Sequence, residues 1–499
     1  MNIPETQELR AASKPTPIAE PPFARYIPLA LWMITIAVLL LIPLKILSLG
    51  YLPAGDARRH IAKVFTDKPY KEIIAFNSYY MTDQSPGWEW LLRFLHRDFG
   101  FDLETLVAFS VASLMLCVFY APLPWLRRPE AWLAALLAQM IAIPEVMTRF
   151  AQARPYLITE GVLIAILFAW SRRDEEKPSW PKLILTTIGI TLSVWMHGTW
   201  YLWMLPIVAF CLAQRWRTAG WLAACFAAGT IVGALLTGNP IAFLEQQVLQ
   251  VIAITREHLP QWMLVGEFRP SYGEFATLAL IGGVILWRWL QSGQRPQLLD
   301  EPVFCMIVLC WVLGFKGDRF WADWGVPAVL VWLTMQFEEI LPPLIDTASA
   351  KRVVLCGLIA APLFLHATND LDRRYTFNLN EVFLDAKDPS LKGWLPEHNG
   401  LFYFAQMDFF YNTFYKNPQS DWRYVLAMEP AMMRPDDLQI LRQIQRYNYN
   451  PKAYEPWIEK MTPADRLVIY SGVEPPLPRL EWHNAIANIW IGRLPKAKN

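Results

Sequence analysis

Residues 27–60 read IPLALWMITIAVLLLIPLKILSLGYLPAGDARRH and decide the fold class of the chain. The run from 27 to 49 is almost continuously apolar, and a membrane-spanning helix needs about 20 such residues. The short turn 50–55 then leads directly to the charged group Asp56-Ala57-Arg58-Arg59-His60. The pattern predicts a membrane helix that brings ionisable side chains to the bilayer surface.

The composition extends the membrane prediction to most of the chain. Of the 499 residues, 54% are hydrophobic and only 18% are charged, whereas soluble proteins carry about 25% charged residues. The net charge of +1 argues against disorder, which requires low hydrophobicity and high net charge. The same balance excludes a protein that binds polyanions through bulk charge, so we expect no nucleic-acid partner.

Eleven apolar segments are candidates for membrane-spanning helices. They lie at 27–49, 104–122, 131–148, 156–171, 183–199, 200–214, 220–238, 274–290, 302–315, 325–343 and 352–367. We therefore predict a mainly α-helical, polytopic membrane protein with about 11 transmembrane helices. The transmembrane domain would cover 27–367, with 50–103 as its first outer loop.

Basic residues in the short loops predict the orientation, because such loops stay in the cytoplasm. If the N-terminal tail 1–26 is cytoplasmic, every second loop should be basic as well. The basic residues at these positions are Arg10, Lys14, Arg25, Arg127, Arg128, Arg172, Arg173, Lys177, Lys182, Arg215, Arg217, Arg288, Arg295, Lys351 and Arg352. The polar segments 50–103, 239–273, 315–324 and 368–499 would then lie outside. In a bacterial inner membrane, which the basic loops favour, that side is the periplasm.

The C-terminal segment 368–499 differs in composition, with mixed charge and many Tyr and Asn residues. The alternating run Arg466–Tyr470 and the stretch Ala485–Ile491 are typical of strands. Residues 435–447 have helical spacing, with acidic residues at the start. We predict a small α/β domain outside the membrane.

Asp56 and its neighbours form the first group of side chains that could carry chemistry. A carboxylate at the bilayer surface can accept a proton from an incoming hydroxyl as a general base. The flanking Arg58 and Arg59 can hold a phosphate. The same pattern also fits a solvated charged turn in contact with lipid head groups, so both interpretations stay open.

The rest of the first outer loop carries two further signals. Apolar residues at 61, 64 and 65 and at 73, 74 and 76 indicate short amphipathic segments lying at the interface. Within 83–92, which reads DQSPGWEWLL, a Pro-Gly turn opens an aromatic helix that points back toward the membrane.

Two arginines lie in the turn between the third and fourth spans, Arg149 and Arg154. Arginines close to membrane depth are costly unless they are paired, and a lipid-borne phosphate would pair them. Snorkelling to head groups is the alternative. Glu160, one helical turn into the fourth span, could instead pair with either arginine.

A third group occupies 316–324, which reads KGDRFWADW. Lys316 and Arg319 can neutralise a phosphate leaving group, and aromatic faces such as Trp321 can stack on sugar rings, with Asp323 beside them. An aromatic belt with interfacial cations is the alternative. His197, at the outer end of the fifth span, is more typical of a hydrogen-bonded packing residue.

Residues 255–272 are charged as well and carry Arg256, Glu257, His258, Glu267 and Arg269. They could line an acceptor groove, but a plain solvated loop is the favoured interpretation.

The sequence resembles the GT-C glycosyltransferases in three features. These are an acidic residue just after the first helix, interfacial helices in the first outer loop, and a Pro-containing turn that follows them. The GT-C glycosyltransferases are integral membrane enzymes that use polyprenyl-phosphate-linked sugars, and the resemblance covers residues 27–367 as an architecture. It implies that Asp56 matches the catalytic acidic residue of the family. It also implies that Arg319 matches an arginine of a late outer loop that contacts the donor phosphate. The segment 85–87 stands where many members carry a His-Pro-Pro-Leu-like motif, and Arg154-Pro155 is similar to a pair that many members show.

Together these patterns predict a membrane glycosyltransferase that moves a sugar from a polyprenyl-phosphate carrier to an acceptor outside the membrane. Asp56 would act as the general base, and the anomeric centre would be inverted. The expected phosphate-binding residues are Arg58, Arg59, Arg149, Arg154, Lys316 and Arg319. The expected substrate-binding residues are His60, Asp83, Trp88, Glu89, His197, Trp321 and Asp323. Whether the acceptor is a glycan, a lipid or a protein stays open.

Cofactors and alternative functions are also constrained. No clear second acidic ligand stands beside Asp56, so no metal site is predicted, although Asp83 or Glu89 could approach it and hold Mg²⁺ or Mn²⁺. The sequence has no Walker A loop, which excludes an ATP-driven pump. A transporter or flippase would need ionisable residues at mid-membrane, where Glu160 is nearly alone. A non-enzymatic membrane scaffold is the other alternative.

Overall fold

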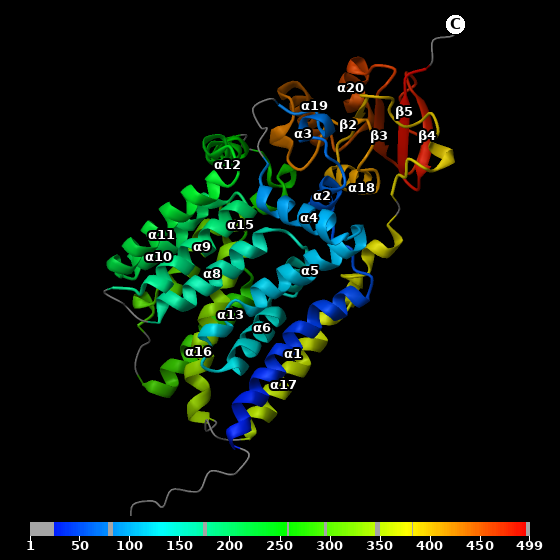
Figure 1. The fold of residues 1–499 in the computed structure, drawn as a ribbon. Coiled ribbons are helices and arrows are strands. Elements are labelled where there is room, and N and C mark those ends of the chain that lie inside the picture. Colours follow the sequence, from blue (N-terminus) through cyan, green and yellow to red (C-terminus); the bar gives the residue numbers. More distant parts are fainter. Residues whose placement is uncertain are drawn as a thin grey trace, which may run out of the picture.

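The computed structural model describes residues 24–77, 83–172, 177–256, 259–293, 297–344, 350–381 and 383–495. They form a bundle of long helices, capped at one end by a smaller domain that contains a sheet (Figure 1). Several residues discussed above lie outside the described ones: Arg10, Lys14, Arg173, Glu257, His258, Arg295 and the side chain of Arg256.

Helices occupy all eleven positions that the sequence predicts. They are α1 (Ile27–Ser48), α5 (Leu103–Tyr120), α6 (Pro129–Ala142) with α7 (Glu145–Ala151), α8 (Tyr156–Ser171), α9 (Trp180–Met196), α10 (Met204–Leu212), α11 (Trp216–Leu235), α13 (Phe275–Ser292), α14 (Pro302–Gly314), α16 (Val326–Leu344) and α17 (Lys351–Thr368). Among the described residues, four helices are long and apolar enough to cross a membrane, or five if the bent pair α6–α7 forms one span. Several others are shorter apolar helices, so the count of eleven complete spans is not confirmed.

The surface of the bundle is suited to lipid. In α1, Leu39 and Ile42 are fully buried, whereas Met33 and Leu41 are 60% and 50% exposed. A helix that is apolar on its buried and on its outward faces fits a membrane environment rather than water.

The segment predicted as a single span at 131–148 is instead broken, and this part of the prediction is wrong. The axes of α6 and α7 differ by 111°. Pro144 is the cause, because proline has no amide donor and forces the preceding residue out of the helical region. Ile143 accordingly has an extended backbone. The bend points α7, and with it Arg149, toward the turn that precedes α8.

The first outer loop folds into three helices, α2 (Asp56–Val64), α3 (Tyr70–Ile73) and α4 (Pro86–Phe99). They confirm the predicted short segments and the helix that opens at the Pro-Gly turn. The polar segment 239–273 begins with a helix that the sequence analysis did not predict, α12 (Pro240–Arg256). The second half contains only the short 3-10 turns Gln261–Met263 and Gly266–Phe268.

The C-terminal domain contains a five-stranded sheet in the order β2-β1-β3-β5-β4. Its elements are β1 (Leu401–Tyr403), α18 (Met407–Lys416), β2 (Arg423–Tyr424), α19 (Pro435–Arg446), α20 (Glu455–Lys460), β3 (Arg466–Tyr470), β4 (Glu481–Ile486) and β5 (Ile489–Arg493). Strand β3 and helix α19 confirm their predictions. The single strand predicted at Ala485–Ile491 is wrong, because a tight turn at Ala487, with φ of 44°, makes an antiparallel hairpin of β4 and β5.

The outer loop and the C-terminal domain are packed together. Ile74 pairs with Tyr424 next to the sheet, and Phe76 pairs with Met433. Helix α2 packs against α18, and Lys68 forms an ion pair of 2.8 Å with Asp421. The domain is thereby held over the end of the bundle at which α2 begins (Figure 1).

Candidate active site

Asp56 is placed by the backbone at the start of α2. Gly55 precedes it with φ of 69° and ψ of −130°, a conformation that only glycine adopts without strain. A Cβ at Gly55 would lie 3.6 Å from a guanidinium nitrogen of Arg154. The sharp entry into the helix therefore brings the Asp56 carboxylate next to the turn between α7 and α8.

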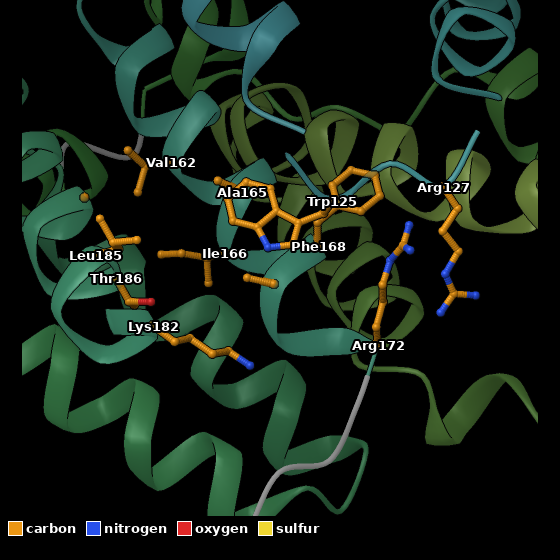
Figure 2. A pocket seen from close by; sticks show the side chains of 12 residues that line it. Trp125, Arg127, Val162, Ala165, Ile166, Phe168, Arg172, Lys182, Leu185 and Thr186 are labelled. Atoms are coloured by element: carbon orange, nitrogen blue, oxygen red, sulfur yellow. The ribbon is translucent and has the colours of Figure 1, made fainter. Parts of the chain in front are cut away.

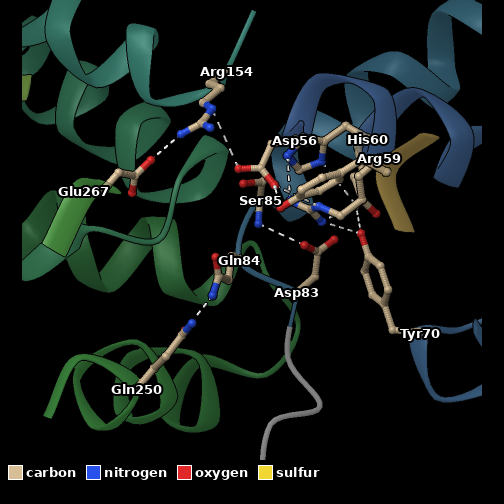
Figure 3. A network of polar contacts seen from close by, with 12 residues as sticks. Asp56, Arg59, His60, Tyr70, Asp83, Gln84, Ser85, Arg154, Gln250 and Glu267 are labelled. Atoms are coloured by element: carbon tan, nitrogen blue, oxygen red, sulfur yellow. Dashed lines mark hydrogen bonds and ion pairs between the residues drawn. The ribbon is translucent and has the colours of Figure 1, made fainter. Parts of the chain in front are cut away.

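Arg59 and Arg154 lie on two sides of the Asp56 carboxylate (Figure 3). Oδ1 lies 3.3 Å from Nε of Arg59, and Oδ2 lies 4.0 Å from Nε of Arg154. The hydroxyl of Tyr411, from α18, donates to Oδ1 at 3.3 Å. Burial raises the pKa of Asp56, but the charges of Arg59 and Arg154 outweigh it and hold the pKa well below its usual range. The carboxylate is therefore ionised, and 29% of the side chain is exposed to an incoming group.

Behind Asp56, Arg59 connects to a buried network within the outer loop. Its guanidinium donates to the Tyr70 hydroxyl at 2.6 Å and lies 2.9 Å from Nε2 of His60. Glu89 accepts from Tyr70 at 2.5 Å and lies 3.3 Å from Nδ1 of His60. Burial, followed by the charge of Arg59, lowers the pKa of His60 to about 3, so the imidazole is neutral. His60 and Glu89 thus position Arg59.

Asp83 adds a second carboxyl group close to Glu89, next to the turn that carries Gln84 and Ser85 (Figure 3). It accepts a hydrogen bond from the backbone N–H of Ser85 at 3.0 Å. Burial and the negative charge of Glu89 raise the pKa of Asp83 to about 7. Asp83 therefore keeps its proton up to about neutral pH, because two adjacent carboxylates resist ionising together.

On the other side of Asp56, Glu267 bridges two arginines from distant parts of the chain. Its two oxygens accept from Arg154 and from Arg319 of α15 (Asp318–Phe320). The favoured prediction of a plain solvated loop is wrong for Glu267, whose side chain is only 17% exposed. Burial raises its pKa, but Arg319 and Arg154 outweigh this and lower it to about 2. A negative charge therefore holds two guanidinium groups side by side.

Two buried N–H groups of Arg154 and Arg319 make no hydrogen bond to the described residues. Among the described residues, neither Nε of Arg154 nor Nε of Arg319 has a hydrogen-bond partner, although both atoms are buried. Buried N–H groups are normally satisfied, and orphaned ones call for an explanation such as a missing ligand. Both face carboxylates at the long end of ion-pair distances, Asp56 at 4.0 Å and Asp323 at 3.8 Å.

Asp323 connects a third arginine, Arg149, to the group formed by Asp56, Arg154, Glu267 and Arg319. It lies in a π-helical turn, Trp321–Gly325, and accepts a hydrogen bond from Nε of Arg149 at 3.0 Å. π-Helical turns are rare and frequent at functional sites. Arg149, delivered by the bend before α7, therefore joins the same cluster as Arg154 and Arg319.

The C-terminal domain contributes a residue that the sequence did not point to. Glu429 is close enough for its charge to interact with Glu267, Arg319 and Asp56, and its Oε2 is buried with no hydrogen-bond partner among the described residues. Burial and the charge of Glu267 raise its pKa to about 8. Nothing in the local sequence Met428-Glu429-Pro430 distinguishes it from a surface residue, since its partners lie in other elements.

Other predicted site residues lie elsewhere. Arg58 is buried and donates to Pro53, Asn412 and Glu381, so its donors hold the C-terminal domain rather than face Asp56. Lys316 is exposed.

The aromatic and histidine candidates are packed inside the protein. Trp88 and Trp321 are 2% and 0% exposed, so neither indole face is open to a sugar ring. His197 lies 3.0 Å from the Thr199 hydroxyl. Glu160 pairs with neither Arg149 nor Arg154, and its two oxygens have no hydrogen-bond partner among the described residues.

The candidate site also bears on metal binding. Within the described part of the chain, no group of three or more His, Cys, Asp or Glu side chains could hold a metal ion. Arg59 and Arg154 flank Asp56, and their positive charges repel a cation.

Comparison with known proteins supports the fold. No family model and no curated protein sequence matches the chain. Among solved structures, ArnT from Cupriavidus metallidurans bound to undecaprenyl phosphate matches with a TM-score of 0.55 and 12% identity, over 95% of this chain and 99% of that one. The Archaeoglobus fulgidus oligosaccharyltransferase in complex with Zn and sulfate matches with a TM-score of 0.50 and 13% identity, over 86% of this chain and 67% of that one. The chain therefore has the fold of the GT-C membrane glycosyltransferases.

Proposed function

We propose that this chain is a membrane glycosyltransferase that transfers a sugar from a polyprenyl-phosphate donor to an acceptor hydroxyl. The observation that carries the proposal is the pair of unused, buried Nε donors of Arg154 and Arg319 beside the ionised Asp56. Guanidinium groups are the preferred partners of phosphate oxygens. A fold shared with ArnT, which was solved with undecaprenyl phosphate bound, supports a lipid-borne phosphate as the ligand.

The arginines would bind the phosphate and stabilise it as it leaves. When the bond between the anomeric carbon and the phosphate oxygen breaks, negative charge accumulates on the phosphate. Arg154, Arg319 and Arg149 would contact this phosphate, and their ion pairs with Glu267 and Asp323 would limit the rearrangement that they require. Glu429, protonated at neutral pH because of its raised pKa, would add a donated hydrogen bond to a phosphate oxygen.

Asp56 would accept the proton of the acceptor hydroxyl as the new bond to the anomeric carbon forms. Its pKa is held low by Arg59 and Arg154, which makes it a weak base in the free protein. A bound phosphate would offset part of the arginine charge and raise the pKa of Asp56. Proton acceptance would thus be coupled to donor binding, and attack from the face opposite the phosphate inverts the anomeric centre.

The location follows the same proposal. We place the protein in a bacterial inner membrane, with the N-terminus in the cytoplasm and the C-terminal domain in the periplasm. The site then faces the periplasm, where a lipid-phosphate leaving group supplies the free energy of transfer. The acceptor is a glycan, a lipid or a protein.

Release of free polyprenyl phosphate tests the proposal. Purified protein would be incubated with a panel of lipid-linked sugars and an acceptor-rich envelope extract. Loss of a general base costs about 10²–10⁴-fold in rate, so Asp56→Asn should lower release by that factor. Asp98→Asn, an exposed acidic residue at the end of α4, is the matched control and should release at the wild-type rate. Equal release by Asp56→Asn would remove Asp56 as the base, and no release from any donor would refute the transferase.

A further inference from the structure

Two of the cavities in the described part of the chain differ in their relation to Asp56. The first, of about 670 Å³, is lined mainly by α8 and α9 (Figure 2). Its residues on α8 run from Val162 to Ala169, toward the end of the helix away from the arginine cluster. The second, of about 260 Å³, lies between residues 262–269, in the outer segment 239–273, and the C-terminal domain. Of the two, the second adjoins the candidate active site.

The second cavity reaches the site from both of its walls. On the wall formed by the outer segment, Gly266 directly precedes Glu267, the carboxylate that holds two arginines together. On the wall formed by the C-terminal domain, Pro430 directly follows Glu429, whose charge interacts with the same group. A molecule in the cavity would therefore lie next to the residues that we assign to the donor phosphate.

Helix α18 connects this cavity to Asp56. Met407 and Asp408, in the first turn of the helix, line the cavity. Tyr411 follows Met407 by four residues and so lies on the same helix face, and its hydroxyl donates to Asp56 at 3.3 Å. One helical turn, about 5.4 Å, therefore separates the cavity lining from the residue that contacts the proposed base.

Exposed aromatic rings border the cavity on both walls. Trp262 of the outer segment is 57% exposed, and Tyr449 of the C-terminal domain is 37% exposed. The negative face of an indole or phenol ring attracts the C–H groups on the apolar face of a sugar ring. The cavity thus offers the open stacking surface that the buried Trp88 and Trp321 do not.

The backbone holds Tyr449 at the cavity in an unfavourable conformation. Its φ is 58°, after Asn448 at 51°, and a bulky residue in this left-handed region is an outlier. The N–H of Tyr449 donates to the carbonyl of Ile444 at 2.9 Å and closes the end of α19, a turn that glycine would form without strain. Strained residues cluster at functional sites, which favours a role for the Tyr449 ring beyond closing the turn.

Polar side chains complete the lining with both donors and acceptors. Asp408 supplies a carboxylate, and Arg269 supplies a guanidinium whose Nε donates to the Leu264 carbonyl at 3.0 Å. Gln445 supplies an amide whose oxygen accepts from Arg442 at 2.9 Å. Both contacts orient a side chain at the cavity. A hydroxyl group both donates and accepts, so a saccharide matches this mixture better than a hydrocarbon chain or a single ion does.

We propose that this cavity binds a sugar unit of the acceptor, so that the acceptor is a glycan. One sugar ring would stack on Trp262 or Tyr449, with its hydroxyls bonded to the polar side chains of the lining, and a neighbouring unit would present its hydroxyl to Asp56. The volume of about 260 Å³ is just below the roughly 300–1,000 Å³ of sites for drug-sized ligands, which suits one sugar unit. The role as acceptor rests on the proposed glycosyltransferase function, whereas saccharide binding in the cavity does not.

Saccharide binding by the full chain, with no donor present, tests this site. Protein in a detergent without a sugar head group would be titrated with di- to tetrasaccharides of glucose, galactose, mannose and N-acetylglucosamine, and with a flexible glycine–serine peptide. Saturation-transfer NMR would follow the binding. We expect at least one saccharide to bind and the peptide not to bind. Trp262→Ala should weaken saccharide binding about tenfold, the value of a stacking contact, and Trp262→Phe, which keeps an aromatic face, should weaken it less.

Two further variants make the result specific. Tyr449→Gly removes the ring and the backbone strain together, so saccharide binding should weaken while the melting temperature stays unchanged or rises. Trp216→Ala, at a 66% exposed position at the start of α11, is the control for losing an exposed tryptophan and should bind as the wild type does. Binding of none of the saccharides, or wild-type binding in both Trp262→Ala and Tyr449→Gly, would overturn the proposal.

Polyprenyl-phosphate release separates this inference from the proposed function. Trp262→Ala should raise the acceptor concentration needed for half-maximal release and leave the dependence on donor unchanged. If no donor gave release but Trp262→Ala still lost saccharide binding, the glycosyltransferase proposal would fail and the saccharide site would remain. If release occurred but no saccharide bound, the saccharide site would fail and the glycosyltransferase proposal would remain.

Discussion

Replacing Glu267 with Gln tests whether one carboxylate organises the phosphate-binding arginines. Its two oxygens accept charge-assisted hydrogen bonds from Arg154 and Arg319, and such bonds contribute about 1.5–3 kcal/mol each. Gln supplies one acceptor oxygen, but its amide group would present N–H donors to the second guanidinium. The three side chains are between 17% and 26% exposed, so solvent compensates little. We expect the variant to lose about 2 kcal/mol of stability, close to the value of one such bond.

The same substitution should impair activity more than stability. An arginine that is free to move by about 1 Å costs roughly 10²-fold in rate, so polyprenyl-phosphate release should fall by about that factor. Thermal unfolding in detergent and the release assay would be measured on the same preparation. Glu104→Gln, at an exposed position at the start of α5, is the control for removing one carboxylate. A wild-type melting temperature and a wild-type release rate in Glu267→Gln would refute the bridging role.

Three further predictions follow from the site. Tyr411→Phe removes the hydroxyl that donates a hydrogen bond to Asp56. Polyprenyl-phosphate release should therefore fall about fivefold, which corresponds to a hydrogen bond of about 1 kcal/mol. Tyr415→Phe, on the same helix, is the control and should keep the wild-type rate, and equal release rates in the two variants would place Tyr411 outside the site. Glu429 has a pKa of about 8 in the folded protein, so the native state keeps a proton that the unfolded chain releases near its ordinary pKa of about 4.3. The free energy of unfolding should therefore fall as the pH rises from 5 to 8. In Glu429→Gln this fall should be smaller, and only the contribution of the raised pKa of Asp83 should remain. An unchanged dependence on pH would contradict a protonated Glu429 in the folded protein. Gly55→Ala places a residue with a side chain at φ of 69°, which costs about 1–3 kcal/mol. The melting temperature and the rate of polyprenyl-phosphate release should both fall. Gly282→Ala is the control, because a Cβ at this helical position meets nothing within 4 Å, and it should leave the melting temperature unchanged or raise it.

The fold was predictable where the signal is local. The apolar run at 27–49 and its ten counterparts mark helices because a membrane helix satisfies its own backbone, whatever its neighbours are. The break in the segment 131–148 was present in the sequence as Pro144, whose effect on the preceding residue is also local. The hairpin in 485–491 was missed, because the first residue of its turn, Ala487–Asn488, is an alanine with φ of 44°, a position where glycine, asparagine or aspartate is usual.

The candidate site was predictable in part. Asp56, Arg149, Arg154 and Arg319 stand out because charged residues next to apolar helices are costly without a purpose. Trp88 and Trp321 were predicted to bind substrate because they are aromatic residues in outer segments, but the structure buries both side chains. Exposure is a property of the packed bundle and cannot be read from an aromatic residue in a loop.

The sequence by itself determined the helical architecture and the presence of an acidic residue and several arginines next to apolar helices. Only the tertiary structure decided which of them meet. Arg154 and Glu267 are 113 residues apart, and Arg319 lies 52 residues beyond Glu267, so no local spacing relates them. Glu429 and Tyr411 join the site only because the C-terminal domain docks on the first outer loop. The hydrophobic pattern of a segment depends only on its own residues and on which of its faces is buried. Ion pairs between distant residues depend on the distances between segments, and those distances are fixed only when the whole chain folds.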